Sequence, residues 1–268
     1  FYKNFSDNLY PKPTSLISYL ISMLDMENEI VLDFFSGSAT TAHAVMDLNA
    51  KDKGNRKFIV VQLPEQTNEK YEAAKAGYDT ISKIGKERIK KAGKMIREKL
   101  QKKYAEATEE EKTTMKNPDE LDTGFKVFRV EDTNFKRIKE IEREDLENKY
   151  KSFSEKDQED FNPHFTDLDV VYELMLRRQD IELTEEIKKL DNIGDRTYIV
   201  GDTMLVCLEE KITDKIVEKI GNIDTDLSWI VLRDSAFDDD CDLKVNTIRK
   251  LRTIVKESGK KDQKIYWI

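Results

Sequence analysis

A turn of small and polar residues early in the chain could bind a polar ligand. Gly37 and Ser38 form its centre, between an apolar run and a helical pattern. Where such a turn follows a parallel strand, a ligand can approach the backbone closely and the next helix offers free N–H groups. Asp33 ends the apolar run, and Thr40 and Thr41 begin the helix. All three side chains can add hydrogen bonds to such a ligand.

A carboxylate beyond the next predicted strand would extend this site. Glu65 follows the run 57–63, and an acidic side chain at a strand tip can accept hydrogen bonds from both hydroxyls of a ribose. Together with the turn, it describes a nucleoside pocket at the edge of a sheet. Two ordinary interpretations stay open, because small-residue turns are common connections in α/β proteins and a lone Glu after a strand is usually solvated.

The turn lacks the two familiar nucleotide-binding fingerprints. A phosphate-binding loop requires a Gly-Lys-Ser/Thr ending and a dinucleotide fold requires Gly-x-Gly-x-x-Gly, and this sequence contains neither. ATP and NAD are therefore weaker candidates for the ligand.

The elements that position these residues form one predicted βαβ unit. Residues 30–35 and 57–63 are short apolar runs typical of buried strands, and residues 39–48 follow a helical pattern. Because such a crossover joins parallel strands, we expect a parallel sheet with the turn at its carboxyl edge. A preceding helix is predicted to begin at Thr14 or Ser15.

Residues 33–41 resemble a known cofactor-binding motif. Their sequence, Asp-Phe-Phe-Ser-Gly-Ser-Ala-Thr-Thr, matches the D-x-F-x-G-S-G-T-T motif of amino-methylating DNA methyltransferases at eight of nine positions, wildcards included. That family binds S-adenosylmethionine with this motif. The resemblance implies the same cofactor for this chain.

Two flanking segments resemble the same family. Pro11-Lys12-Pro13 stands about twenty residues before the motif, where the family has a Lys-Pro motif, and residues 56–65 resemble its second strand with the ribose-binding acid. This order is that of the permuted β class, in which the catalytic motif lies earlier in the chain. The resemblance implies a set of cofactor-binding residues: Lys12, Pro13, Asp33, Phe35, Gly37, Ser38, Thr40, Thr41 and Glu65.

Later segments resemble the modification subunits of type III restriction systems, less closely than residues 8–65 do. Those subunits are adenine N6-methyltransferases. The resemblance therefore implies methyl transfer to adenine N6 of double-stranded DNA, a restriction subunit as partner, a homodimer of the full-length subunit and a cytoplasmic location. The segments are 81–92, 123–135, 171–174 and 234–237 with Asn246.

Ala39 departs from the motif, which has glycine at this position. If the backbone there needs a positive φ, alanine costs about 1 kcal/mol. Within the first turn of the helix, alanine is harmless or helpful. We expect Ala39 to lie in that first turn.

The residues that would catalyse methyl transfer are missing from this sequence. In the family, an Asp, Asn or Ser followed by Pro-Pro and an aromatic ring holds the amine of a flipped base. The five prolines of this chain are nowhere adjacent. The chain also begins at Phe1 without a polar lead-in. We therefore expect the C-terminal part of a modification subunit, with part of the cofactor pocket and no methyltransferase activity of its own.

A basic stretch stands out in an otherwise acidic chain. Residues 83–103 hold 10 basic and 2 acidic residues, whereas the whole chain has a net charge of −8. Lys90, Lys91 and Lys94 on this predicted helix could contact DNA phosphates. The ordinary alternative is a solvated helix face whose two glutamates pair with neighbouring lysines.

The whole chain is predicted to be α/β. We expect part of a Rossmann-like, S-adenosylmethionine-dependent methyltransferase core with a parallel sheet over 1–78, a basic helical connector with a strand over 79–150, and a smaller acidic α/β domain over 151–268. An alternative role for the last part is protein interaction, in dimerisation or in docking the restriction subunit. Further helices are predicted over 71–107, 168–178, 184–190, 213–220 and 243–257, a helix end and loop over 105–123, and strands over 124–130, 196–200, 203–208, 228–232 and 264–268.

Other patterns do not indicate a metal site, a nucleophile or a membrane segment. Two cysteines cannot form a disulfide framework, no Cys/His cluster has zinc spacing, and the acidic residues 234–242 lack the register of a calcium loop. Those acids are expected to favour a helix N-terminus. His43 is expected to be a structural or ligand-rim residue, His164 to lie in a loop, and Cys207 to lie in a buried strand. No apolar run approaches the roughly 18 residues of a membrane span.

Overall fold

The chain forms two units, each with its own sheet and apolar core. The computed structural model describes residues 11–24, 26–67, 72–136, 154–178, 180–238, 240–260 and 263–268. The units are Phe1–Val127, with a two-stranded sheet, and Phe128–Ile268, with a five-stranded sheet. The predicted mixed α/β class is confirmed.

The first unit is built on the predicted βαβ crossover. Strands β1 (Ile30–Asp33) and β2 (Lys57–Val60) pair in parallel, and helix α2 (Thr40–Asp52) connects them. Both strands are shorter than predicted, because the chain leaves the ladder after Asp33 and Val60. The carboxyl ends of the two strands meet at one edge of the sheet, where the candidate turn follows β1.

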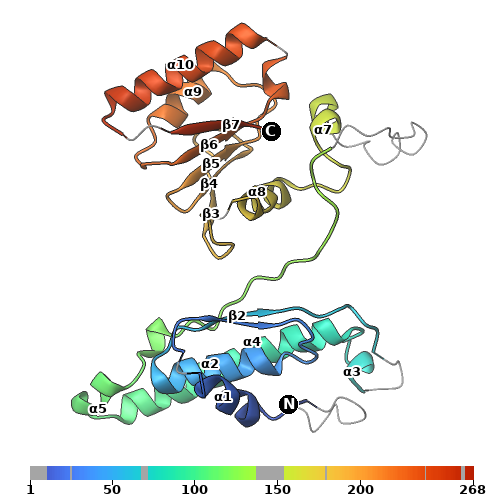
Figure 1. Cartoon of the computed structure of the whole chain (residues 1–268), viewed down its shortest axis with the longest axis vertical. Helices are drawn as coiled ribbons and strands as arrows, with labels where there is room; N and C mark the ends of the chain where they lie inside the picture. The colour runs from blue at the N-terminus through green and yellow to red at the C-terminus, as the bar shows by residue number, and fades with distance from the viewer. Residues whose placement is uncertain are drawn as a thin grey trace. The chain divides into compact units, whose positions relative to one another are not determined.

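Helix α2 lies at the centre of the first unit. Helices α1 (Thr14–Ser22) and α4 (Ile81–Glu106) pack against it, and all three lie on one side of the strands (Figure 1). Most of α2 is buried, so its sequence is apolar around much of the helix rather than on one stripe. The two apolar clusters of the unit join α2 to α1 and to α4.

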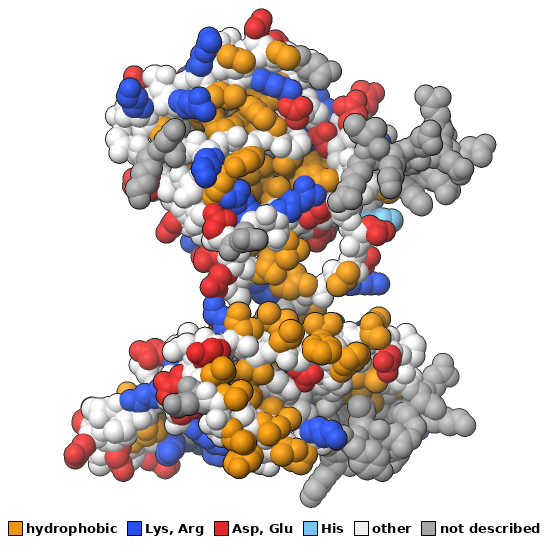
Figure 2. All heavy atoms as spheres, in the orientation of Figure 1, with side chains coloured by type: hydrophobic (Ala, Val, Ile, Leu, Met, Phe, Trp, Pro, Cys, Tyr) orange, Lys and Arg blue, Asp and Glu red, His pale blue; other side chains and the backbone are white. Residues whose placement is uncertain are grey.

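The opposite face of the small sheet is apolar and exposed. The side chains of Ile30, Leu32, Ile59 and Leu63 are each at least half exposed. Figure 2 shows hydrophobic side chains gathered over this unit, and α1 with the two residues that follow it adds exposed Tyr19, Met23 and Leu24. The two strands therefore alternate exposed and partly buried residues, and their exposed face is largely apolar where a solvated sheet face would carry polar side chains.

Two predictions for the first unit are wrong. The predicted helix over 71–107 is two helices, α3 (Glu72–Lys75) and α4, because Gly77 adopts a φ of +89° and Thr80 caps α4 by accepting a hydrogen bond from the Lys83 backbone N–H. Residues 124–130 form no strand: within the described ranges the segment has no ladder partner, and Val130 is 97% exposed. The predicted helix end and loop contains a short helix, α5 (Glu109–Thr114), and a 3-10 turn, η2 (Pro118–Glu120).

The second unit is a mixed sheet covered on both faces. Its strands are ordered β3-β4-β5-β6-β7; β3, β4 and β5 pair antiparallel, and β5, β6 and β7 pair parallel. One apolar cluster joins the sheet to α8 and the other joins it to α9 and α10 (Figure 1). The elements are α7 (Glu155–Asp160), α8 (Asp167–Leu176), β3 (Ile187–Lys189), β4 (Thr197–Val200), β5 (Met204–Cys207), α9 (Asp214–Gly221), β6 (Trp229–Leu232), η4 (Ser235–Phe237), α10 (Cys241–Glu257) and β7 (Lys264–Trp267).

Most predicted elements of this unit are confirmed, and one is wrong. The hairpin over 196–208 and the helices α8, α9 and α10 lie where the sequence predicts them. Residues 184–190, predicted as a helix, instead contain the edge strand β3, which pairs with β4 from Ile187 to Lys189. Pairing with a free sheet edge overrides the weak helix preference of this charged segment.

A buried ion network fastens α7 to the sheet. The side chain of Arg233, at the end of β6, is 0% exposed and donates to Asp157 at 2.8 Å and to Asp160. Arg196 donates to the same Asp157 at 2.8 Å and to Asp167 at 2.7 Å. The Asp157 carboxylate compensates both cations, so its loss would leave the buried Arg233 and the partly buried Arg196 with one carboxylate partner fewer each.

The two glycines of α4 give a matched test of the packing in the first unit. A Cβ on Gly85 would lie 3.4 Å from its nearest atom, the Gly37 carbonyl oxygen, whereas a Cβ on Gly93 would lie 2.9 Å from the Thr123 Cβ. Alanine favours a helix over glycine by up to about 1 kcal/mol, and overpacking costs about 1–3 kcal/mol. We expect Gly85→Ala to raise the free energy of unfolding by up to about 1 kcal/mol and Gly93→Ala to lower it by about 1 kcal/mol.

Urea unfolding followed by far-UV circular dichroism measures this difference. Both tryptophans, Trp229 and Trp267, lie in the second unit, so their fluorescence serves as an internal control that neither variant should change. Equal shifts for the two variants would contradict the close approach at Gly93.

Candidate functional site

The Asp33 carboxylate organises the turn between β1 and α2. Its Oδ1 accepts a hydrogen bond from the Phe35 backbone N–H at 3.2 Å, and its Oδ2 accepts one from the Thr41 hydroxyl at 2.6 Å. One side chain therefore joins the end of the strand to the start of the helix. Each carboxylate oxygen keeps a further lone pair that a ligand can use.

Backbone bonds tie the centre of the turn to the end of β2. The Ser36 N–H donates to the Val61 carbonyl at 3.1 Å, and the Gly37 N–H donates to the Gln62 Oε1 at 2.8 Å. Gly37 adopts a φ of +52°, a conformation that glycine reaches without strain, and nothing lies within 4 Å of where its Cβ would be. The turn is therefore fixed from one side and open at Gly37 on the other.

A buried arginine from α4 holds the other side of the turn. The Arg88 Nη1 donates to the Ser38 hydroxyl at 3.0 Å, to the Ser38 carbonyl at 3.4 Å and to the Thr40 hydroxyl at 2.5 Å. Arg88, Ser38 and Thr40 are all buried. The Ser38 and Thr40 hydroxyls therefore accept hydrogen bonds from Arg88 and stabilise the conformation of the turn.

Ala39 lies outside the helix, which corrects the prediction that it lies in the first turn. It precedes α2 with φ 59° and ψ 44°, which is the left-handed conformation, at the position where the resembled motif has glycine. That conformation costs alanine about 1 kcal/mol. Its methyl group is buried with Met46 and Ile89, which returns about 0.8 kcal/mol. The two effects nearly cancel, so the turn accepts alanine.

The predicted site residues divide into buried and exposed members. Thr41 is buried with Ser38 and Thr40, whereas the Phe35 ring is 78% exposed and lies 5.2 Å from the Phe34 ring, centroid to centroid. Glu65 is exposed, and its backbone carbonyl accepts a hydrogen bond from the Ile81 N–H at 3.0 Å. Phe35 and Glu65 are thus exposed, and Asp33 and Gly37 are partly exposed, so these four can be reached by a ligand.

Lys12 and Pro13 lie at the start of α1 rather than in the turn. Pro13 is the N-cap of α1, where its carbonyl accepts a hydrogen bond from the Leu16 N–H at 3.2 Å, and both side chains are exposed. No hydrogen bond or ion pair joins either residue to the turn in the described part of the chain. The structure therefore places six of the nine predicted residues in the turn and at the ends of the elements that it joins. Glu65 follows β2 and is bonded to the start of α4, and Lys12 and Pro13 lie at the start of α1.

Two residues that hold the turn were missed by the sequence analysis. Gln62 lies in the second strand run, and Arg88 lies in the basic stretch. Arg88 could have been found from its position, because it falls on the same helix face as the apolar Ile84, Ile89 and Ala92. A cation on the buried face of a helix requires partners, and the nearby hydroxyls provide them.

The remaining candidates behave as structural residues. Burial, and then the charge of Arg88, lower the pKa of His43, so it is held neutral. Burial raises the pKa of the Cys207 thiol to about 11, and Asp240 caps α10 by accepting from the Leu243 N–H at 2.9 Å. Over the described ranges, no three His, Cys, Asp or Glu side chains are grouped to hold a metal, and no helix has the length and hydropathy to cross a bilayer.

The three lysines proposed to contact DNA are exposed on α4 but have different surroundings. Lys91 forms an ion pair with Glu87 at 3.2 Å, and Lys94 lies 3.9 Å from Glu98. These are the pairs expected for a solvated helix face. Lys90 has no acidic partner among the residues that the structure describes.

Comparison with known families assigns the segment that contains this turn. Residues 3–75 match the model of a family described as DNA methylase, which acts on N6 or N4 amino groups according to its name. The match includes β1, the turn, α2, β2 and Glu65. The expected methylase domain is confirmed over these residues.

Curated relatives are type III modification subunits and a type II enzyme. The chain is 45% identical over 95 residues to the StyLTI Mod subunit of Salmonella typhimurium, and 47% identical over 93 residues to the EcoP15I Mod subunit of Escherichia coli. Each alignment covers 35% of this chain, and 15% and 14% of those subunits. The type II methyltransferase M.KpnI of Klebsiella pneumoniae is 38% identical over 74 residues, 28% of this chain and 18% of the enzyme. The resemblance to type III modification subunits is confirmed for a small part of their length.

The contact between Arg88 and the turn can be tested with a second arginine of α4 as control. We expect Arg88→Met to lower the free energy of unfolding of the first unit by about 1–3 kcal/mol, because buried hydroxyl and carbonyl groups lose a charged donor. Arg97 is exposed and donates one bond, to the Leu121 carbonyl at 2.8 Å, so Arg97→Met should cost less than about 1 kcal/mol. Urea unfolding by circular dichroism compares the two, and equal costs would show that the turn does not depend on Arg88.

Proposed function

We propose that this chain is part of a DNA methyltransferase that uses S-adenosylmethionine to methylate adenine N6 at a specific sequence, in a cytoplasmic type III restriction-modification system. The turn between β1 and α2 carries this proposal, because it lies within the methylase match and has the geometry of a ligand site. The similarity extends over 95 and 93 residues with two type III Mod subunits, but over 74 residues with the type II enzyme. The longer similarity favours the type III assignment.

The residues around the turn fit S-adenosylmethionine. Gly37 leaves open space where the cofactor can approach the backbone, and Asp33 keeps acceptor capacity for its amino group. Glu65 has no side-chain partner within the described ranges and can accept both ribose hydroxyls. Phe35 offers an exposed aromatic face, and the buried Ser38, Thr40 and Thr41 maintain the shape of the turn. When bound, the cofactor supplies the methyl group to be transferred.

The exposed face of the small sheet supports the proposal that the methyltransferase core extends beyond these residues. A parallel sheet of a Rossmann-like core is covered on both faces, whereas the helices among the described residues cover only one face of this sheet. Further methyltransferase elements would bury Ile30, Leu32 and Ile59 and supply walls to the cofactor pocket. Cofactor affinity of the isolated chain should therefore be weak.

The partners of the complete protein are also proposals. Duplex DNA follows from the proposed reaction, and the restriction subunit and a homodimer follow from the similarity to type III Mod subunits. Residues 128–268 form their own apolar clusters on both faces of a sheet, which favours a separate role for them in docking the restriction subunit or in dimerisation.

Cofactor binding can be tested through Glu65, whose side chain makes no hydrogen bond or ion pair with another residue that the structure describes. We expect S-adenosylhomocysteine to bind weakly to the 268-residue chain and about tenfold more weakly to Glu65→Gln, since a charge-assisted hydrogen bond contributes about 1.5 kcal/mol. Isothermal titration calorimetry measures both affinities. Glu110→Gln, an exposed acid on α5, is the control and should leave the affinity unchanged. No saturable binding, or equal loss in both variants, would count against the site.

Methyl transfer provides a separate test. The sequence has no Pro-Pro-aromatic motif, so we expect the purified chain to transfer no labelled methyl group from S-adenosylmethionine to duplex DNA, even at saturating cofactor. The assay is scintillation counting of recovered DNA, with a complete adenine methyltransferase as positive control. Transfer above background by this chain would show that its residues include a catalytic group that we have not identified.

A further inference from the structure

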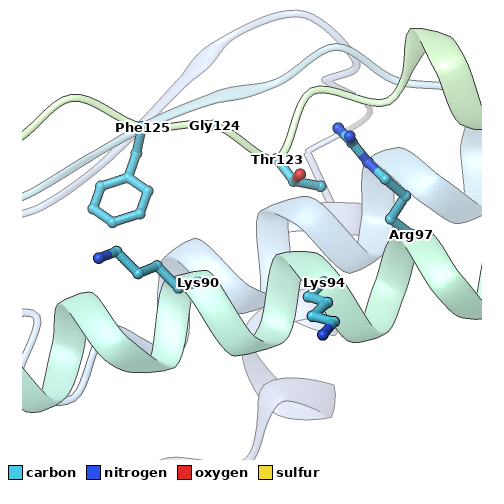
Figure 3. A pocket seen from close by; sticks show the side chains of 6 residues that line it. All are labelled: Lys90, Lys94, Arg97, Thr123, Gly124 and Phe125. Atoms are coloured by element: carbon cyan, nitrogen blue, oxygen red, sulfur yellow. The ribbon is translucent and has the colours of Figure 1, made fainter.

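The outer flank of α4 contains a hollow lined by cations (Figure 3). None of its six lining residues is acidic, and its volume is about 470 Å³. Figure 3 shows the Phe125 ring above the Lys90 side chain and Arg97 extending toward Thr123. The lining residues are Lys90, Lys94, Arg97, Thr123, Gly124 and Phe125.

Close packing fixes the wall of this hollow. Segment 121–125 lies against α4 because Gly93 has no side chain to keep Thr123 away. Leu121 is 2% exposed in the apolar cluster, and its carbonyl accepts a hydrogen bond from Arg97 at 2.8 Å. The shape of the hollow is therefore fixed by packing, and the Arg97 guanidinium is held by the backbone of segment 121–125.

The cations of this flank are only weakly neutralised. Lys90 has no acidic partner in the described residues, Lys94 lies 3.9 Å from Glu98, and the hydrogen bond of Arg97 goes to a neutral carbonyl. Spacings of four and three residues place the three on one flank of the helix, and Lys86 continues the row one turn earlier. Lys91 lies outside this hollow and pairs with Glu87.

We propose that this flank of α4 binds the phosphodiester backbone of duplex DNA, with phosphates at Lys90, Lys94 and Arg97. The proposal rests on the proposed function, because a DNA methyltransferase must hold its duplex. From Lys86 to Arg97 the helix rises about 16 Å, which matches about five phosphates of one strand at about 3.4 Å each. Such contacts position DNA without reading its sequence.

Helix α4 would then serve the cofactor turn and the DNA together. Arg88 contacts the turn, and Lys90, two residues later, lies about 200° farther around the helix. The two sites are therefore on opposite sides of one rigid element. This arrangement fixes the DNA backbone relative to the cofactor through α4 alone.

The test is the salt dependence of DNA affinity. A fluorescent duplex of mixed sequence is titrated with the 268-residue chain at several salt concentrations between 50 and 200 mM. A plot of log affinity against log salt concentration has a negative slope, and each lost phosphate contact makes that slope shallower by about 0.9. We expect the triple variant Lys90→Gln, Lys94→Gln and Arg97→Gln to make this slope shallower by about 2–3. The triple variant Lys91→Gln, Lys102→Gln and Lys103→Gln removes the same charge from α4 outside the hollow and should change the slope by less than about 1.

Equal slopes for the two triple variants, or no DNA binding by the unmodified chain at 50 mM salt, would overturn the inference. Circular dichroism confirms that each variant is folded. Calorimetry with S-adenosylhomocysteine separates the two proposals. If S-adenosylhomocysteine binds equally to the unmodified chain and to both triple variants, while the two variants have equal salt slopes, only the proposed DNA site is wrong. If the unmodified chain binds no analogue, the proposed function fails whatever the DNA result.

Discussion

The contact between the buried Arg88 guanidinium and the turn before α2 is the constraint on which the first unit depends. A cation taken out of water is stable only where polar atoms replace its hydration. Here the Nη1 group is solvated by the Ser38 hydroxyl and carbonyl and the Thr40 hydroxyl, all within one turn. The turn cannot change shape without leaving the cation poorly solvated. The start of α2, the seating of α4 and the open side at Gly37 are therefore parts of one arrangement.

That arrangement explains why only some of the motif faces a ligand. Asp33 and Thr41 bond to each other, and Ser38 and Thr40 bond to Arg88, so four polar side chains are engaged within the protein. Because these bonds fix the turn, Gly37 and Phe35 remain open to solvent. Glu65, in the segment that follows β2, is exposed as well. A motif of nine residues thus contains more side chains that support the turn than side chains left open to the proposed ligand.

The sequence predicts this fold well wherever the signal is local. The runs that became β1, β2, β4 and β5 are apolar and bounded by turn residues, and the parallel crossover follows from their separation. The predictions for residues 184–190 and 124–130 are wrong because strand formation depends on a partner edge that sequence does not display. The first segment pairs with β4, and the second has no ladder partner among the described residues. At the site, Asp33 and Gly37 were visible from their types, whereas Arg88 is 50 residues from its partner Ser38 and required the packing of α4 to be known. Ala39 was misplaced because burial of its methyl group offsets a backbone strain that sequence alone predicts to be unfavourable.

The packing of α4 also decides which of its positive charges act on the surroundings of the protein. Residues 83–103 carry 10 basic and 2 acidic residues in a chain of net charge −8. Of these cations, Arg88 is buried in the turn and Lys91 is paired with Glu87, so neither adds freely to the field outside the helix. Exposed charges act over about 8 Å at physiological salt, so the local arrangement on one flank decides what binds there. Because residues 151–268 hold 19 basic and 27 acidic residues, their field opposes a polyanion. An acidic chain with one basic flank therefore restricts where DNA can bind more strictly than a uniformly basic chain would.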